Sequence, residues 1–180
     1  MKLAKIFYLA IIILSLQACA SAARPERMIP IFGSSLETTE PTNIVVASVA
    51  GGSATNPLWT SQVDSSAFNQ ALNSSLSAAS LQIATAENSS AYVLEASLNR
   101  LSQPLISINT SVTSEIFYKV TKQVDGSEVF AETVTATGTA SFGEALLGGH
   151  DERVRLANEY SIRENIRIFI ERLVGILNNR

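Results

Sequence analysis

The residues of this 180-residue chain that most readily suggest chemistry are one histidine, one cysteine and one glycine-rich turn. His150 could act as a general base towards a serine, but no Gly-x-Ser-x-Gly turn presents such a nucleophile. His150 directly precedes Asp151, a possible helix cap, so we interpret it as a loop residue. The carboxylates lack the spacing of a calcium loop, and one histidine with one cysteine cannot complete a zinc site. We therefore expect no catalytic residue, no metal and no cofactor.

The turn Gly51-Gly52-Ser53 lies between a predicted strand and a predicted helix, where backbone N–H groups can hold an anion. It lacks the lysine and the spacing of a phosphate-binding loop, and it also lacks the spacing of a dinucleotide-binding motif. We interpret it as a flexible connection into the helix.

The segment Asn56-Pro57-Leu58-Trp59 is the one most suggestive of partner binding. It contains the only tryptophan and precedes a predicted helix whose polar face is uncharged. Tryptophan is enriched at recognition sites because it combines a large apolar surface with one hydrogen-bond donor. The alternative is that Trp59 fills the end of the core, since most tryptophans are largely buried.

The N-terminus has the layout of an export signal. Lys2 and Lys5 precede the uncharged run Ile6–Leu14, which is shorter than the roughly 20 residues that a membrane-spanning helix requires. Ser15-Leu16-Gln17-Ala18 follows, so that a small residue directly precedes Cys19. We therefore expect residues 1–18 to be a signal peptide that is removed.

The residues Leu16-Gln17-Ala18-Cys19 resemble the lipobox of bacterial lipoproteins, although Gln17 is a less usual occupant of its position. The resemblance implies that Cys19 becomes the first residue of the mature chain, with diacylglycerol on its thiol and an acyl chain such as palmitate on its amino group. More than one acyl chain gives durable membrane anchoring. In lipoproteins of enterobacterial type an aspartate after the cysteine marks retention at the inner membrane. Ala20 stands there, so the resemblance implies the outer membrane, periplasmic face.

The mature chain is mildly acidic. Loss of Lys2 and Lys5 leaves 11 of the 13 basic residues against 16 acidic ones, a net charge of −5. Such a balance gives no electrostatic basis for binding nucleic acid. With one cysteine, the exported domain has no internal disulfide. We expect residues 19–42 to form a lipidated tether, with Met28–Phe32 able to dock, and residues 43–180 to form a single periplasmic domain.

Hydrophobic periodicity predicts six elements in the order strand, helix, three strands, helix. The first strand, Asn43–Ala50, is apolar throughout and is expected to be covered on both faces. A helix follows within Ser61–Ser80, with Ser61 or Asp64 as its cap. The next two strands alternate, with one face of each predicted to be buried; those positions are Tyr92, Leu94, Ala96, Leu98, Ile106, Ile108, Val112, Ile116, Tyr118 and Val120.

Asp125-Gly126 predicts a hairpin turn. It would join the strand that contains Ile116 and Val120 to a strand from Glu128 to about Thr139. A three-residue loop pairs Val120 with Phe130, Ile116 with Val134 and Lys122 with Glu128. A two-residue turn would instead place Phe130 on the polar face, so burial favours the longer loop. The favoured register sets Glu132 on the inward face opposite Tyr118.

Asp151 to about Leu177 predicts a long helix capped by Asp151, with a buried stripe at spacings of four, three, four and three: Ile162, Ile166, Phe169, Leu173 and Ile176. Two pairs of opposite charge, Glu159–Arg163 and Arg167–Glu171, have i, i+4 spacing. The arginines of this helix are expected to form a solvated face; they are Arg153, Arg155, Arg163, Arg167 and Arg172.

This order of elements predicts an α+β fold, a two-layer sandwich with about four mainly antiparallel strands and two helices on one face. The lipobox, Asn56–Ser61 and Arg155-Leu156-Ala157-Asn158-Glu159 together resemble a group of uncharacterised proteobacterial lipoproteins. In outline the chain also resembles YajG-like lipoproteins and, more distantly, accessory lipoproteins of envelope lipid-transport systems. The resemblance implies a non-enzymatic domain that binds an envelope protein or lipid. The alternatives are an envelope-acting enzyme, a hydrolase or acyltransferase using His150 and a serine, or a subunit of an oligomeric secretion pore that contributes the Ile106–Thr139 hairpin.

Overall fold

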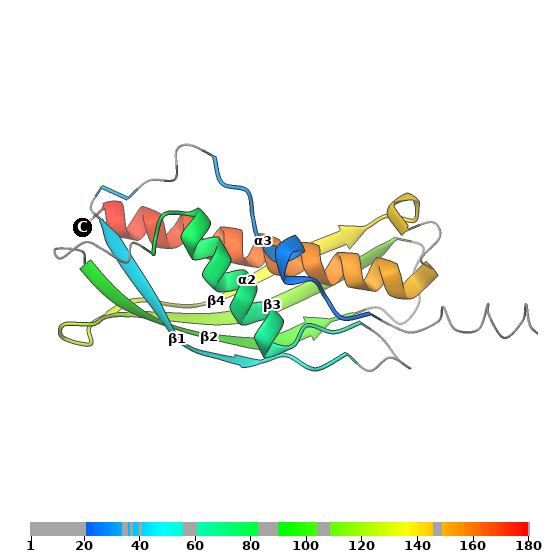
Figure 1. Cartoon of the computed structure of the whole chain (residues 1–180), viewed down its shortest axis with the longest axis horizontal. Helices are drawn as coiled ribbons and strands as arrows, with labels where there is room; N and C mark the ends of the chain where they lie inside the picture. Colours follow the sequence, from blue (N-terminus) through cyan, green and yellow to red (C-terminus); the bar gives the residue numbers. More distant parts are fainter. Residues whose placement is uncertain are drawn as a thin grey trace, which may run out of the picture.

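The computed structural model describes residues 21–33, 36, 38–39, 41–55, 61–82, 90–103, 109–145 and 149–179. These residues form one four-stranded sheet with two helices packed against it (Figure 1). The elements in chain order are η1 (Pro25–Met28), β1 (Thr42–Gly51), α2 (Ser65–Ala78), β2 (Ser90–Ser102), β3 (Thr110–Lys122), β4 (Glu128–Ala140), η2 (Gly143–Ala145) and α3 (Gly149–Asn178). The predicted α+β fold and order of elements are confirmed.

The strands lie in the order β1-β2-β3-β4, with β1 parallel to β2 and the other two pairs antiparallel. Both helices cover the same face of this sheet, and the alternating apolar residues of the described strands are buried beneath them (Figure 1). Ile106 and Ile108, also predicted to be buried, lie outside the described residues. The predicted stripe of α3 is also buried, except that Ile176 is only partly buried. Among the described residues, no helix is long and apolar enough to cross a membrane.

Strand β1 corrects the prediction of a strand covered on both faces. It lies at one edge of the sheet, and the helices cover one face of it, with Ile44 buried there. Val45 points to the opposite face and is 48% exposed. The apolar residues of β1 therefore form an edge strand with one exposed apolar face, not a central strand.

The hairpin has the predicted register through most of its length. Val120 pairs with Phe130, Ile116 with Val134 and Tyr118 with Glu132. Near the turn the predicted Lys122–Glu128 pair is wrong, because the register shifts and Thr121 pairs with Glu128. The Lys122 N–H donates to Ser127 O, and Gly126 takes a left-handed conformation at φ 69°. The loop is thus one residue longer than predicted, and a bulge restores the register.

Helix α2 begins where Asp64 caps it. The Asp64 carboxylate accepts a hydrogen bond from the Ala67 N–H at 2.8 Å, which satisfies a donor that the first turn leaves without an intrahelical partner. Ser61, the other predicted cap, lies before the helix and is fully buried.

We expect Asp64→Ala to lower the free energy of unfolding by about 1 kcal/mol, the usual cost of losing an N-cap side chain. Asp64→Asn should retain most of the stability, because asparagine caps equally well. Urea unfolding of both variants measures this effect. An equal loss in the two variants would contradict the capping role.

The polar side of α3 differs from the prediction in three ways. The helix begins at Gly149, so Asp151 lies in its first turn and is not the cap. The predicted Glu159–Arg163 pair is wrong, because Glu159 is fully buried and binds Arg24, while Arg163 lies over the ring of Tyr160. The predicted Arg167–Glu171 pair is confirmed at 2.6 Å. Arg153 is 8% exposed, so the arginines do not all form a solvated face.

Helix α3 approaches β4 closely at Gly138. A Cβ atom added at this glycine would lie 2.2 Å from the backbone nitrogen of Ser161 and 2.5 Å from the carbonyl oxygen of Ala157. Both of these atoms belong to the backbone of α3, so no side-chain movement could relieve the contact. Gly138 therefore sets the distance between helix and sheet.

Candidate functional site

Two of the sequence-predicted sites, Cys19 and Asn56-Pro57-Leu58-Trp59, lie outside the described residues. Among the described residues, the structure has a hollow of about 450 Å³ beside the end of β1. Its lining residues are Gly51, Gly52, Ser53, Gln62, Val63, Leu98, Asn99, Arg100 and Leu101.

The Gly51-Gly52-Ser53 turn is used for packing. Gly51 and Gly52 have φ values of 78° and 73°, and a Cβ at Gly51 would lie 2.1 Å from Leu98 O. The N–H of Gly52 donates to Leu98 O and that of Ser53 donates to Val63 O. These two donors are therefore occupied within the fold, which supports the interpretation of the turn as a connection and not a phosphate loop.

His150 lies in the first turn of α3 and is half-buried. Within the part of the chain that the structure describes, no group of three potential metal ligands occurs.

Because we expect no catalytic role for His150, His150→Ala should complement fully in a strain with a scorable envelope defect. The measurement is restoration of the envelope phenotype at matched protein level. A His150→Ala protein that is present at the parental level but gives no complementation would contradict the non-enzymatic interpretation.

A set of polar side chains lies buried between α3 and the sheet. Asn165 donates from Nδ2 to the carbonyl oxygens of Val134 and Ser114, and its Oδ1 accepts from the Tyr118 hydroxyl at 3.1 Å. Ser161 donates to Ser114 Oγ at 2.8 Å. Burial raises the pKa of Tyr118 well above its usual value, and no carboxylate or imidazole takes part in these contacts. The set therefore fixes the position of the helix and offers no nucleophile with a base.

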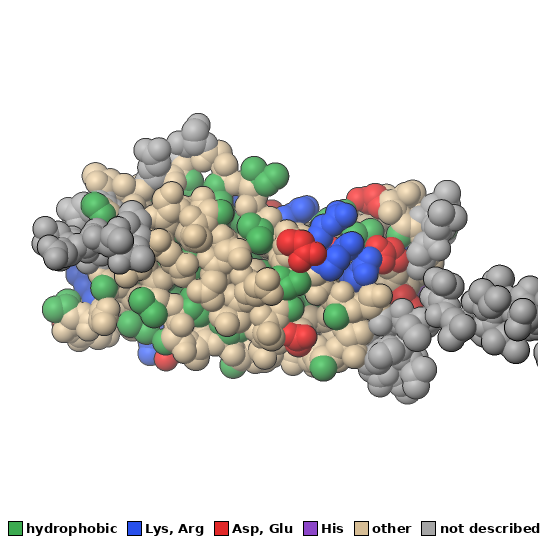
Figure 2. Space-filling model, in the orientation of Figure 1, with side chains coloured by type: hydrophobic (Ala, Val, Ile, Leu, Met, Phe, Trp, Pro, Cys, Tyr) green, Lys and Arg blue, Asp and Glu red, His purple; other side chains and the backbone are tan. Residues whose placement is uncertain are grey.

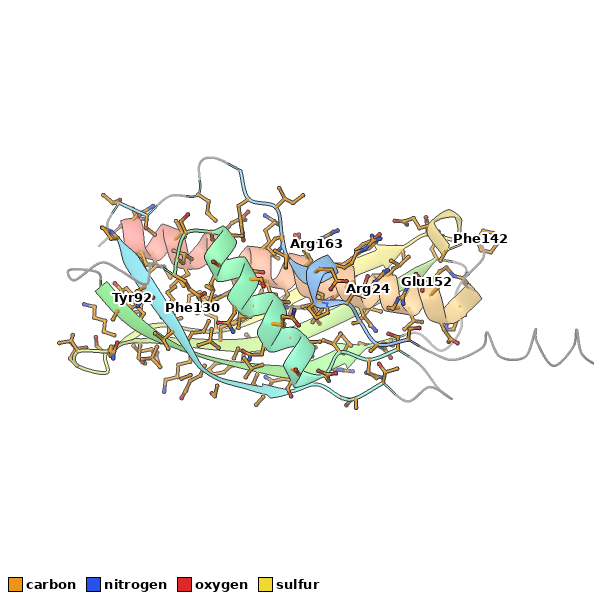
Figure 3. All side chains as sticks on the ribbon, in the orientation of Figure 1. Arg24, Tyr92, Phe130, Phe142, Glu152 and Arg163 are labelled. Atoms are coloured by element: carbon orange, nitrogen blue, oxygen red, sulfur yellow. The ribbon has the colours of Figure 1, made fainter. Side chains whose placement is uncertain are left out.

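A second contact fastens the N-terminal segment to α3. The buried Glu159 carboxylate accepts three hydrogen bonds from Arg24, one from its backbone N–H and two from its guanidinium, at 2.9–3.0 Å. This side-chain hydrogen bonding raises the pKa of Arg24. Ala23, next to Arg24, is buried. Met28 is also buried, as expected for docking of Met28–Phe32, but Ile31 of that run is 95% exposed. Part of the segment that was expected to be a tether thus packs on the domain (Figure 3).

Charged side chains gather over η1 and the first half of α3, whereas the surface around α2 carries few (Figure 2). The charged area includes Arg155, which bonds to Glu152 at 2.6 Å. Because opposite charges pair here, this area has no excess of one sign that would attract a polyanion.

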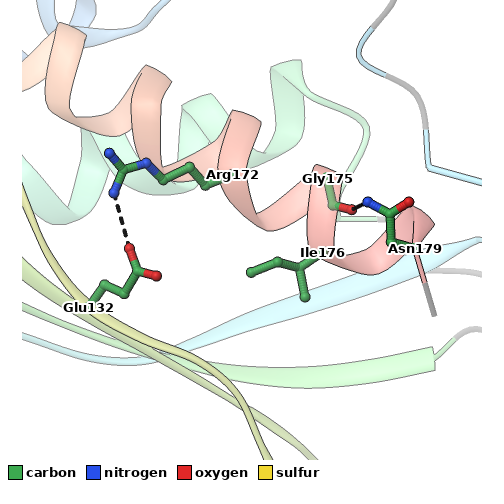
Figure 4. A pocket seen from close by; sticks show the side chains of 5 residues that line it. All are labelled: Glu132, Arg172, Gly175, Ile176 and Asn179. Atoms are coloured by element: carbon green, nitrogen blue, oxygen red, sulfur yellow. Dashed lines mark hydrogen bonds and ion pairs between the residues drawn. The ribbon is translucent and has the colours of Figure 1, made fainter.

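Another hollow, of about 530 Å³, lies where the end of α3 faces β4 (Figure 4). Arg172 donates to Glu132 across it at 3.0 Å, and Asn179 donates to Gly175 O at 2.7 Å. This ion pair explains how Glu132 can face the helices, since the side chain lies at the edge of the sheet and is exposed. The polar groups that line the hollow bond to one another, so we assign it no ligand.

The remaining candidate is the face of the sheet that no described helix covers, here called the open face. It is made of outward side chains from all four strands, including Val45, Ser48, Val93, Glu95, Ser97, Arg100, Thr113, Glu115, Phe117, Lys119, Thr133, Thr135 and Thr137. Phe117 lies between Ser97 and Thr133 in the register and is partly exposed.

Charges on the open face are few and oppose one another. Glu95 is opposite Lys119, and Glu115 lies 3.9 Å from Arg100. Thr113 and Thr137 bond across the strands at 2.9 Å. One side of β4 pairs with β3, and its other side has no partner strand among the described residues. A surface with few and mutually opposed charges, a central aromatic residue and an open strand edge can bind a protein by packing or by strand addition.

Sequence reasoning did not identify the open face as a site. The signal was Phe117, an apolar residue on the side of β3 where the alternation predicts polar residues. The Arg24–Glu159 contact was also missed, because its partners are 135 positions apart in the sequence.

Comparisons with known proteins identify the fold and no activity. No family model and no curated protein matches the chain. Among solved structures, a Xanthomonas campestris protein assigned to DUF330 has a TM-score of 0.62 and 11% identity, over 87% of this chain and 95% of that chain. A hypothetical protein from Chlamydia trachomatis has a TM-score of 0.52 and 11% identity, over 77% of this chain and 99% of that one. A candidate lipoprotein from Caulobacter crescentus has a TM-score of 0.47 and 14% identity, over 74% and 90%.

Proposed function

We propose that this chain is a lipid-anchored protein of the bacterial cell envelope that binds a partner protein and catalyses no reaction. The observation that carries the binding role is the open face, a continuous surface across four strands with Phe117 near its middle. The anchor is supported by the export-signal layout and by the lipobox-like residues before Cys19.

The character of the open face supports a protein partner. Interface centres are depleted of charge and enriched in aromatic residues, and the open face has Phe117 among threonines and serines. Its four charged residues oppose one another, so little electrostatic attraction to a polyanion is expected.

The finer proposal places the protein at the outer membrane, facing the periplasm, as an accessory component in envelope maintenance or transport. It is supported by Ala20 in the position where an aspartate would mark the inner membrane. The resemblance to YajG-like lipoproteins and to accessory lipoproteins of envelope lipid transport supports the same role.

Photo-crosslinking in intact cells tests the binding role. A photoreactive amino acid at position 117 should give a discrete adduct of one partner, identified by mass spectrometry. The matched control places the same group at position 171, an exposed site on the outer side of α3. Adducts at position 171 that equal those at 117, or no adduct at 117, would contradict binding through the open face.

A second candidate is membership of an oligomeric pore or secretion assembly, favoured by the open edge of β4. This strand is 13 residues long and has no charged residue between Thr133 and Ala140, so little prevents another strand from pairing with it. Mass measurement in mild detergent decides this point: a large closed oligomer would favour strand addition between copies, and a monomer would exclude it.

A further inference from the structure

The folded part of the chain begins very close to the proposed lipid. The Ala23 side chain is 6% exposed, and its N–H donates to Gln62 O at 3.3 Å. The next residue, Arg24, is held by Glu159. Three residues separate Cys19 from Ala23, and the four steps from one Cα atom to the next span at most about 14 Å. The expected tether of residues 19–42 would have spanned about 80 Å when extended.

Ala23 lies at one particular end of the sheet. It contacts Gln62, whose side chain donates to Gln103, and Gln103 directly follows the last residue of β2. Strands β2 and β4 run in the same direction, because each is antiparallel to β3. The end of β4 therefore lies at the same end of the sheet as Ala23. Phe142 follows β4 by two residues, and Figure 3 shows it at that extremity.

This end has the residues of a membrane-contacting surface. Phe142 is 49% exposed, and the guanidinium carbon of Arg153 lies 5.4 Å from its ring centre. Exposed aromatic side chains are favoured at the boundary between headgroups and acyl chains.

The opposite end of the molecule is too far from Ala23 to contact the bilayer. The turn between β3 and β4 contains Val124, which is 88% exposed. The 13 residues of β4 separate this turn from Phe142 by about 43 Å. A link of about 14 Å from Ala23 can bring the near end of the sheet to a bilayer, but not the far end.

We propose that the domain stands directly on the bilayer, with Phe142 at the lipid surface and the β3–β4 turn pointing away. The inference rests on the proposed anchoring at Cys19. The open face then runs along the membrane normal and is accessible to a partner from the periplasm.

Site-specific fluorescence tests this orientation on the protein produced with its export signal and placed in phosphatidylethanolamine–phosphatidylglycerol vesicles. Cysteine is introduced in separate variants, Phe142→Cys, Val124→Cys and Ile31→Cys, and labelled with a thiol-reactive environment-sensitive dye. Ile31 lies on the N-terminal segment and is 95% exposed. A dye at this position would be quenched if the domain lay with that side against the bilayer. Gly143→Cys gives a second label at the near end, where a Cβ atom meets nothing within 4 Å.

A headgroup spin-labelled lipid should quench the dyes at 142 and 143 by more than half, and those at 124 and 31 by less than a tenth. Equal or stronger quenching at 124 or at 31 would overturn the orientation while leaving the anchor intact. The unsubstituted protein is the control for the anchor. Dye uptake by its Cys19 thiol, or failure to float with the vesicles, would instead refute the proposed function.

Discussion

Gly138→Ala is expected to lower the free energy of unfolding by about 3 kcal/mol, within the upper part of the range for overpacking a core. The added methyl group would lie 2.2 Å from the Ser161 nitrogen, so α3 would have to move away from β4. That movement would lengthen the hydrogen bonds of Asn165 and Ser161 to β4 carbonyls, which are now 2.8 and 3.1 Å. Urea unfolding followed by circular dichroism measures the loss.

Gly175→Ala is the matched control. Gly175 is an exposed residue of the same helix, and an added Cβ atom there meets nothing within 4 Å. Alanine should stabilise the protein by roughly 0.5–1 kcal/mol, because glycine in a helix interior is unfavourable. If Gly138→Ala were as stable as the parent, the close approach of α3 to the sheet would be wrong.

Arg24→Ala should lower the free energy of unfolding by about 2–3 kcal/mol. The substitution leaves the Glu159 carboxylate buried without its two guanidinium hydrogen bonds, and removing one partner of a buried ion pair is costly. Arg155, whose Nε lies 3.9 Å from Glu159, should offset part of the loss. Limited proteolysis should also cut the N-terminal segment faster, because Arg24 fastens it to α3.

Arg167→Ala provides the comparison for an ion pair at the surface. Arg167 bonds to Glu164 and Glu171, all three on the outside of α3, so its loss should cost less than about 1 kcal/mol. If Arg24→Ala and Arg167→Ala lowered the free energy of unfolding equally, burial of Glu159 would not make its ion pair with Arg24 more important than a surface pair.

Those parts of the fold that depend on regular spacing could be predicted from the sequence. The alternation in β3 and the stripe of α3 each repeat over several turns or pairs, so single exceptions do not obscure them. The hairpin register followed from burial, which is decided by many residues together. Its bulge near Glu128 was missed because two neighbouring apolar residues, Val129 and Phe130, both find buried positions there.

Contacts that join distant segments could not be predicted in this way. The sequence shows Glu159 as one more charge on a helix, and only the fold places it under Arg24. Similarly, Asn165 and Ser161 interrupt the apolar stripe of α3 as polar residues that would ordinarily be solvated. Their hydrogen-bond partners on β3 and β4 are 25 to 51 positions away, so pattern alone cannot identify them.

The candidate sites also differ in whether they depend on local sequence or on contacts between distant segments. Cys19 and Asn56–Trp59 were chosen for residue type and local context, and both remain predictions. By contrast, the open face is assembled from all four strands, and no stretch of sequence contains it. Phe117 was its one visible sign, since it breaks the polar alternation of β3.

Membrane attachment through Cys19 is tested most directly by comparing the parent with Cys19→Ser in fractionated cells. The parent should sediment with membranes, and the mass of its mature N-terminal peptide should begin at Cys19 and include the diacylglycerol and acyl groups. The Cys19→Ser protein should lose both the lipid mass and the membrane association. A serine variant still cut before position 19 and still held in the membrane fraction like the parent would contradict the anchor.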